Sequence, residues 1–131
     1  MILVDSSAWI EVLRGRRRET FASIAPPGEI VTCLPVIQEV LQGFDHVAVR
    51  RIARAALNDV PTIEEPLTRA VFDEAIELFL SARRAGLTIR SGVDCLIAAC
   101  AIRNNATLLH VDRDFTKLAT VSPLKAQLLV E

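Results

Sequence analysis

The chain has 131 residues, of which 51% are hydrophobic and 24% are charged, with a formal net charge of −1. These values exclude a disordered or fibrous protein and allow a full hydrophobic core, so we predict a single domain over residues 1–131. The positive mean hydropathy indicates that part of the apolar surface contacts a partner.

The sequence also bears on the compartment. It shows no basic segment followed by an apolar run and a cleavage site, as a secretory signal would. Its longest apolar run, residues 96–102, is much shorter than the about 20 residues that a membrane helix requires. We therefore expect a cytoplasmic protein that does not enter a membrane. The cysteines form no C-x-x-C pair and stand in apolar runs, as reduced core residues do: Cys33, Cys95 and Cys100.

The first residues contain a strand, an acid and the start of a helix. The apolar run Ile2–Val4 is typical of a strand buried on both faces in a parallel sheet. Helical spacing of apolar residues begins at Ser7 and continues up to Gly15. Asp5 is therefore expected at the carboxyl end of a strand, the edge at which open α/β sheets bind ligands. The alternative is that Asp5 or Ser6 only caps the helix.

A cluster of four arginines follows this helix: Arg14, Arg16, Arg17 and Arg18. Such a run either contacts phosphates or a partner, or forms a solvated face, and we keep both interpretations. The net charge does not argue against a nucleic-acid partner. If four of the 16 acids gather in one metal site, the 15 lysines and arginines outnumber the remaining acids, so the rest of the surface is mildly basic.

A second strand and a helix are predicted next. The β-branched residues of Ile30–Cys33 indicate the strand, and Pro35 is suited to the first turn of a helix that ends before Gly43. Glu39 lies one turn into this helix. On its own it would be an ordinary exposed polar residue.

Two further helices are predicted over residues 45–57 and 67–85, with a short strand at 60–63 between them. The first helix has apolar residues on one side and a basic stripe on another, made by Arg50, Arg51 and Arg54. The apolar stripe of the second helix is wider than one core face requires. Core packing explains this width, and a surface for self-association or for a partner peptide is the alternative.

A buried helix and a buried strand then carry the remaining acids. Ser91-x-x-Asp94 precedes an apolar run and has the pattern of a capping box. The helix that follows is apolar on nearly all sides and must cross the middle of the domain. The strand 107–111 ends on Asp112 and Asp114, for which a turn and a helix cap are the simple explanations. Residues 121–123 and 128–130 are predicted as a last edge element.

Four acids share a predicted location at the carboxyl edge of one sheet: Asp5, Glu39, Asp94 and Asp112. Converging carboxylates repel one another unless a positive charge neutralises them. A hard divalent cation, Mg²⁺ or Mn²⁺, takes carboxylate oxygens, and no histidine or cysteine is placed to indicate zinc. Such a site is used for in-line attack on a phosphodiester. We therefore predict these four acids as catalytic metal ligands.

Four motifs together resemble those of PIN-domain ribonucleases, specifically VapC-type toxins. They are M-I-L-V-D-S-S-A-W, the helical Glu39, S-G-V-D-C-L-I-A-A and H-V-D-R-D-F. The likeness covers the whole chain in order, spacing and length. It implies an α/β fold, namely a PIN-like α/β/α sandwich with a central, mainly parallel sheet of about four to five short strands.

The resemblance also implies an activity, a cofactor and partners. The activity is a Mg²⁺-dependent endoribonuclease, in which Mn²⁺ can substitute, acting on structured RNA such as tRNA or ribosomal RNA. The partners are a VapB-type antitoxin, a second copy in a homodimer, and a toxin–antitoxin hetero-oligomer. The family's metal-binding acids correspond to Asp5, Glu39, Asp94 and Asp112. Ser6 matches a hydroxyl that helps to order the site, and Asp114 matches a further acid, for which a helix cap is the alternative.

Two other functions were weighed against this one. A haloacid-dehalogenase-like phosphatase also begins with a strand that ends in Asp, but it needs a second Asp where this chain has Ser7. A non-catalytic dimerising or partner-binding module, whose acids only cap helices, is the alternative function. Titration with a divalent ion separates this module from a metal-dependent nuclease, because a pure binding module gains no stability from the ion.

Overall fold

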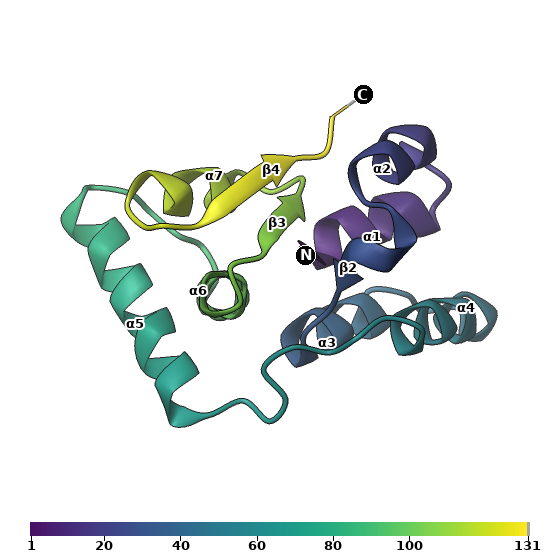
Figure 1. The fold of residues 1–131 in the computed structure, drawn as a ribbon, viewed down its shortest axis with the longest axis horizontal. Helices are drawn as coiled ribbons and strands as arrows, with labels where there is room; N and C mark the ends of the chain where they lie inside the picture. Colours follow the sequence, from purple (N-terminus) through teal and green to yellow (C-terminus); the bar gives the residue numbers. More distant parts are fainter. Residues whose placement is uncertain (131) are drawn as a thin grey trace.

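The computed structural model describes residues 1–130 and has a parallel sheet at its centre, with helices on both sides (Figure 1). Its four strands are β1 (Ile2–Val4), β2 (Ile30–Val31), β3 (Thr107–His110) and β4 (Lys125–Leu128). Their spatial order is β2-β1-β3-β4, and every neighbouring pair is parallel. The predicted α/β fold with a mainly parallel sheet is confirmed.

Seven α-helices join the strands within residues 1–130. They are α1 (Ser6–Leu13), α2 (Arg18–Ile24), α3 (Leu34–Gln42), α4 (Val47–Asn58), α5 (Arg69–Arg84), α6 (Gly92–Arg103) and α7 (Arg113–Thr120), with a 3-10 turn, η1 (Pro27–Glu29), before β2. In Figure 1, α5 lies to the left of the strands, α6 is seen end-on below β4, and α2 lies to the right. None of these helices is both long and apolar enough to cross a bilayer.

The sheet brings its functional edge together through parallel pairing. Leu3 pairs with Val31 on one side and with Leu108 on the other. Because the strands are parallel, the residues that follow β1, β2 and β3 emerge at the same edge. Leu3, Val4 and Leu108 are fully buried, and burial of each such side chain stabilises the fold by about 1.5–3 kcal/mol.

Helix α6 crosses the middle of the molecule, as its apolar sequence predicts. It packs against α3, α5, α7 and β3, and seven of its 12 residues are buried. Small side chains such as Ala98 and Ala101 are fully buried and allow its neighbours to approach closely. The acid in its first turn, Asp94, is therefore held by the most enclosed helix of the fold. All three cysteines are buried and free, as predicted.

Two predicted helix ends show why glycine is required there. Gly15 and Gly86 have φ values of +81° and +77°, the left-handed region that glycine adopts without a steric penalty. After α5, the backbone N–H of Leu87 donates to the carbonyl of Ala82 at 2.9 Å, which satisfies a free carbonyl of the last turn.

Three predictions about elements were wrong. Helix α2 was not predicted; it has no side-chain cap and no fully buried residue, so its sequence signal is weak. The predicted strand 60–63 forms only an isolated bridge between Thr32 and Thr62, because Pro61 has no N–H to donate. The last strand is β4 and not residues 121–123 and 128–130. It is an edge strand with little burial, so no apolar run marks it.

Candidate metal centre

Asp5 follows β1 and is the N-cap of α1. Its Oδ2 accepts a hydrogen bond from the backbone N–H of Ser7 at 3.0 Å and another from the Ser7 hydroxyl. The Ser7 hydroxyl oxygen in turn accepts a bond from the backbone N–H of Val111 at 3.1 Å, which joins the start of α1 to the end of β3. Asp5 Oδ1 is buried and has no hydrogen-bond partner within residues 1–130. Capping therefore uses one oxygen and leaves the other available for a cation.

Glu39 reaches the same edge from α3. The Ser6 hydroxyl donates to Glu39 Oε1 at 2.9 Å, so the first residue of α1 orders a carboxylate from another helix. Helices α1 and α3 pack against each other, which keeps this contact in place. Ser6 thus acts on Glu39, while Ser7 acts on Asp5.

Asp94 lies in the first turn of α6 and is only 7% exposed. The predicted capping box forms only in part. The Ser91 hydroxyl oxygen accepts a hydrogen bond from the backbone N–H of Val93 at 3.2 Å, whereas the Asp94 carboxylate accepts no hydrogen bond from residues 1–130. Asp94 is therefore not needed to cap the helix that carries it.

Asp112 and Asp114 have exchanged the simple roles considered for them. Asp112 is the N-cap of α7, and its Oδ1 accepts a hydrogen bond from the backbone N–H of Asp114 at 2.9 Å. Asp114, 1% exposed, is not a cap but a residue of the first turn. Its Oδ2 accepts a hydrogen bond from the backbone N–H of Arg90 at 3.0 Å. The helix-cap explanation thus applies to Asp112 and not to Asp114.

Two of the acids, Asp5 and Asp94, have raised pKa values. Burial raises the pKa of Asp94 to about 7, with further increases from the negative charges of Asp112, Asp5, Glu39 and Asp114. Burial also raises the pKa of Asp5 to about 6, against the opposing effect of its hydrogen bonds with Ser7. Asp94 is therefore the residue on which the charges of all four other acids act.

A metal ion fits these donors. Asp94, Asp112 and Asp114 can each offer one carboxylate oxygen, and these oxygens lie within 4.8 Å of one another. Asp5 and Glu39 are outside that tight group, yet near enough for their charges to raise the pKa of Asp94. The unpartnered, buried Oδ1 of Asp5 is what a cation would satisfy. An all-oxygen, anionic donor set is typical of a hard divalent ion.

Three residues beside the acids were not singled out from the sequence: Ser7, Arg90 and Lys117. Arg90 Nη2 donates to Asp112 Oδ1 at 3.1 Å, and Lys117 Nζ lies 3.6 Å from Asp114 Oδ1. With Arg113 they line a cavity of about 560 Å³ next to the acids. Arg90 stands directly before the Ser91 cap, but only the fold shows that its side chain meets α7.

The arginine cluster has partners within the molecule. Arg14 lies over the ring of Phe44, with its guanidinium carbon 5.9 Å from the ring centroid. Arg16 pairs with Glu11 at 3.4 Å. Arg17 and Arg18 donate to the backbone carbonyls of Leu129 and Val12, at 3.2 and 3.3 Å. The four side chains thus stabilise the region around α1 and α2, and a role in binding RNA or antitoxin stays a prediction.

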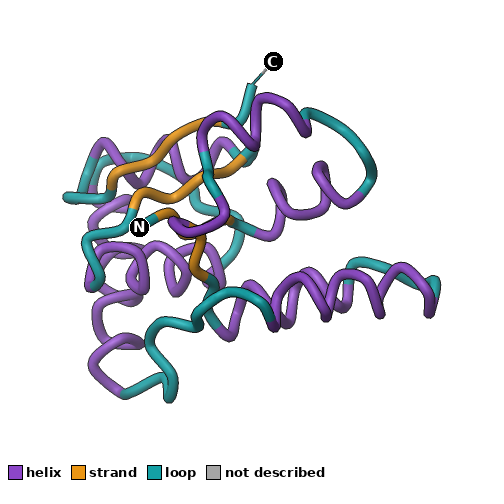
Figure 2. The backbone as a smooth tube through the Cα atoms, turned by 45° about the vertical axis from the view of Figure 1, so that its right-hand side comes forward, coloured by secondary structure: helices purple, strands orange, loops and turns teal. Residues whose placement is uncertain are grey.

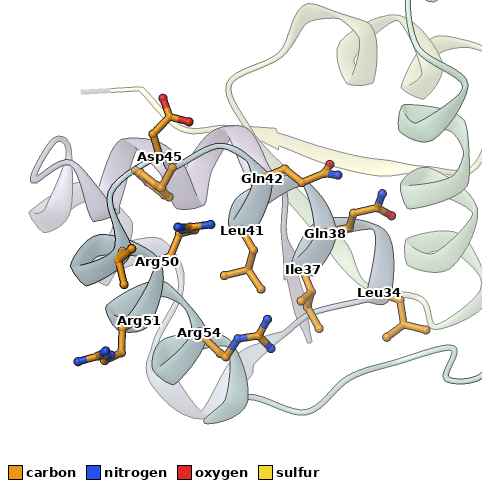
Figure 3. A pocket seen from close by; sticks show the side chains of 11 residues that line it. Leu34, Ile37, Gln38, Leu41, Gln42, Asp45, Arg50, Arg51 and Arg54 are labelled. Carbon is orange, nitrogen blue, oxygen red and sulfur yellow. The ribbon is translucent and has the colours of Figure 1, made fainter.

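A groove of about 770 Å³ lies between α3 and α4, which extend together beyond the strands (Figure 2). Figure 3 shows the apolar side chains of Ile37 and Leu41, from α3, flanked by Arg50 and Arg54 of α4. Val47, at the start of α4, also lines the groove and is 60% exposed. The predicted basic stripe of α4 therefore borders a groove with apolar residues at its floor, which Gln38, Gln42 and Asp45 also line.

Comparison with known proteins agrees with this geometry. The family model of the PIN domain matches residues 2–121. Ribonuclease VapC11 from Mycobacterium tuberculosis is 35% identical to this chain over 136 aligned residues, which cover 96% of this chain and 97% of VapC11.

Solved structures with the same fold include two of toxin–antitoxin type. VapBC2 from Rickettsia felis, bound to a DNA fragment from its promoter, superposes with a TM-score of 0.77 at 19% identity, covering 98% of each chain. VapC20 from Mycobacterium tuberculosis, a toxin that cleaves the sarcin–ricin loop, superposes with a TM-score of 0.65 at 20% identity, covering 88% of this chain and 93% of VapC20. The acid-lined sheet edge, the matched family model and the identity to VapC11 lead to one conclusion: this chain belongs to the PIN domain family and, within it, to the VapC group.

Proposed function

We propose that this protein is a metal-dependent endoribonuclease, the toxin of a pair, which cleaves structured RNA such as tRNA or ribosomal RNA and is neutralised by a VapB-type antitoxin. The observation that carries the proposal is the group of buried carboxylates around Asp94, with an unpartnered Asp5 oxygen among them. The 35% identity to a VapC ribonuclease over nearly the whole chain supports the ribonuclease activity. The divalent ion, Mg²⁺ with Mn²⁺ as a substitute, is inferred from the oxygen donors.

Different residues of the chain have different roles in such a site. We assign metal binding to Asp5, Glu39, Asp94 and Asp112, with Asp114 as a neighbouring supporting acid. When bound, the ion supplies a water of lowered pKa as nucleophile and positive charge near the leaving oxygen. Ser7 orients Asp5 and ties it to the end of β3, and Ser6 orients Glu39. These hydroxyls fix the carboxylates before the ion and the RNA arrive.

The experiment that tests the proposal combines stability with cleavage. The thermal unfolding midpoint is measured in EDTA and with increasing Mn²⁺, and the same samples are incubated with purified tRNA and with ribosomal RNA. We expect a rise of the midpoint with Mn²⁺, RNA cleavage that needs the ion, and cleavage sites that map to defined positions. A protein that neither gains stability from Mn²⁺ nor cuts RNA would instead be the non-catalytic binding module.

The groove between α3 and α4 supports the antitoxin part of the proposal. Its apolar floor fits an apolar segment of a small partner, and its arginines fit acidic residues beside that segment. An antitoxin arginine extended to the acids could pair with a carboxylate and displace the metal ion without a change of fold. Mn²⁺ affinity of the free protein and of the complex with the antitoxin tests this, because equal affinities would leave only steric exclusion of RNA.

A second apolar surface supports the homodimer. Phe72, Ile76 and Val93 are 47%, 56% and 38% exposed and border a cavity of about 450 Å³ between α5 and α6. Such a continuous apolar surface is unfavourable in water and is typical of self-association. We propose that two copies pair through it. Sedimentation velocity is expected to show a dimer for the native chain and a monomer for Ile76→Glu.

A further inference from the structure

One arginine of this chain lies on the carboxylates of the candidate metal centre. Arg90 Nη2 donates to Asp112 Oδ1 at 3.1 Å, and Arg90 Nε lies 3.5 Å from Asp114 Oδ2. The guanidinium therefore neutralises two acids that stand in the group able to hold a metal ion.

The main chain and the side chain of Arg90 are held differently. The backbone N–H of Arg90 donates to the buried Asp114 carboxylate at 3.0 Å, which fixes the segment before α6. The side chain is 70% exposed, and its ion pairs within residues 1–130 are those with Asp112 and Asp114. The guanidinium can therefore leave the acids while the backbone stays in place.

A divalent ion and the guanidinium compete for Asp112. Its Oδ1 already accepts a hydrogen bond from the backbone N–H of Asp114 as the cap of α7, in addition to the bond from Arg90. A doubly charged ion bound to Asp112 would repel a guanidinium a few ångströms away and would reduce the negative charge that holds it. Metal binding thus weakens the ion pairs of Arg90.

The neighbouring cavity offers the released side chain a new partner. Arg90, Arg113 and Lys117 line its wall beside the two acids. The three cations already outnumber the two acids of the wall, and an ion that neutralises those acids makes the wall more positive. A phosphate group of RNA is the ligand that suits it, because a guanidinium binds phosphate oxygens through two parallel hydrogen bonds.

We propose that Arg90 is a metal-controlled RNA-binding residue. It neutralises Asp112 and Asp114 while the site holds no ion, and it transfers to an RNA phosphate beside the scissile bond when a divalent ion binds. This inference rests on the proposed ribonuclease function. It gives the site an order of binding, in which the ion comes first and prepares the phosphate contact.

The first test is the Mn²⁺ affinity of the RNA-free protein, measured by isothermal titration calorimetry for the native chain and for Arg90→Gln. Removal of a competing, largely exposed cation is expected to tighten Mn²⁺ binding by about two- to fivefold. Arg84→Gln is the matched control, because Arg84 also pairs with a carboxylate, Glu77, on the surface at 3.8 Å, and it should leave the affinity unchanged. An Arg90→Gln affinity equal to or weaker than that of the native chain overturns the inference.

The second test is RNA affinity with and without a divalent ion. A fluorescent RNA hairpin is titrated in EDTA and in Ca²⁺, and its integrity is checked on a denaturing gel. We expect Arg90→Gln to weaken RNA binding in Ca²⁺ and to lower the salt-dependence slope there by roughly 0.7–0.9, with little change in EDTA. Arg90→Lys, which keeps the charge, should restore part of the affinity. An equal loss in both solutions would mean that the ion does not control Arg90.

The two tests separate this inference from the proposed function. A native chain that neither binds Mn²⁺ nor cleaves RNA contradicts the function itself. A native chain that does both, beside an Arg90→Gln variant with unchanged Mn²⁺ and RNA affinities, contradicts only the role of Arg90. Folding of the variants is expected, since the stabilising backbone bond to Asp114 does not involve the side chain.

Discussion

The acid centre and the α3–α4 groove present opposite physical problems. In the centre, Asp5, Asp94 and Asp114 are at most 7% exposed and carry like charges. In the groove, Arg50, Arg51 and Arg54 are exposed and have no ion-pair partner within residues 1–130, while apolar side chains lie open between them. One region buries charge, and the other exposes apolar surface.

The difference shows where function conflicts with stability. Burial of repelling carboxylates disfavours the folded state. Arg90 and Lys117 offset the charges of Asp112 and Asp114, but not those of Asp5 and Asp94, whose burial opposes folding until a metal ion binds. The groove has little effect on the stability of the fold, because its side chains are in contact with water in the folded state as well as in the unfolded state. Its apolar residues contribute a favourable free energy only when a partner covers them. Substitutions in the centre should therefore affect activity and stability in opposite directions, whereas those in the groove should affect binding alone.

The largest effect is expected from Asp94→Asn. The amide keeps the size of the side chain but removes the charge of a ligand, so metal-dependent RNA cleavage should fall at least about 100-fold. Because Ser91 and not Asp94 caps α6, the metal-free protein should not lose stability, and its free energy of unfolding at pH 8 should rise by up to about 2 kcal/mol. Gel assays of cleavage and urea unfolding measure both quantities.

Asp73→Asn is the matched control, because Asp73 is an exposed acid of α5 and its replacement should change neither quantity. Near-native cleavage by Asp94→Asn would falsify the assignment of Asp94. A large loss of stability would instead show that the acid holds the helix, as in the non-catalytic interpretation.

The groove should give the second largest effect. Val47→Glu places a charge on its apolar lining and is expected to weaken antitoxin binding about 10- to 100-fold, while unfolding changes by less than about 0.5 kcal/mol. Ile52→Glu is the control, since Ile52 is 62% exposed on the same helix but does not line the groove. If calorimetry shows that both variants bind the antitoxin with the same affinity, the antitoxin binds at another surface.

The pH dependence of stability tests the burial of charge in the centre. The folded-state pKa values of Asp5 and Asp94 are raised from 3.8 to about 6 and about 7, so the stability from their neutral forms is complete below about pH 4. This contribution to stability is lost as the pH rises through the two folded-state pKa values, about 6 and about 7. In EDTA, the native chain should therefore lose about 1–2 kcal/mol more than Asp94→Asn between pH 5 and pH 8.

Comparison of the two chains removes the contribution of His110, whose pKa burial lowers and which acts in the opposite direction. Addition of Mn²⁺ at pH 8 should restore the lost stability in the native chain only. Parallel pH profiles of the two proteins would show that Asp94 is ionised without penalty.

The smallest effect is expected from the arginines. Each phosphate contact that is lost should lower the log–log salt slope of RNA binding by roughly 0.7–0.9. Replacement of Arg50, Arg51 and Arg54 by Gln should therefore lower the slope more than replacement of Arg14, Arg16, Arg17 and Arg18, whose side chains already have partners within the molecule. The reverse order, measured by fluorescence anisotropy at several salt concentrations, would show that the cluster Arg14, Arg16, Arg17 and Arg18 makes more phosphate contacts with RNA than the arginines of α4.

The sequence alone was sufficient for strands β1, β2 and β3 and for the expectation that the candidate acids share one edge of the sheet. Continuous apolar runs such as Ile2–Val4 can only be buried on both faces, and parallel strands must end at one edge, so an acid after β1 and one after β3 come together. The wholly apolar α6 could be placed in the middle for the same reason. These are consequences of local pattern, which sequence carries directly.

Tertiary structure decided the contacts made by exposed polar side chains. Arg90, just before α6, meets the acids only because α6 packs beside α7, whereas Lys117 meets Asp114 within α7, three residues along the same helix. Ser7 joins the ends of two strands only because β1 lies next to β3. The exposed β4 and the weakly capped α2 have no apolar pattern to reveal them. Burial leaves a periodic mark in the sequence, whereas a charged side chain at the surface can point to many partners, and the packed fold selects one.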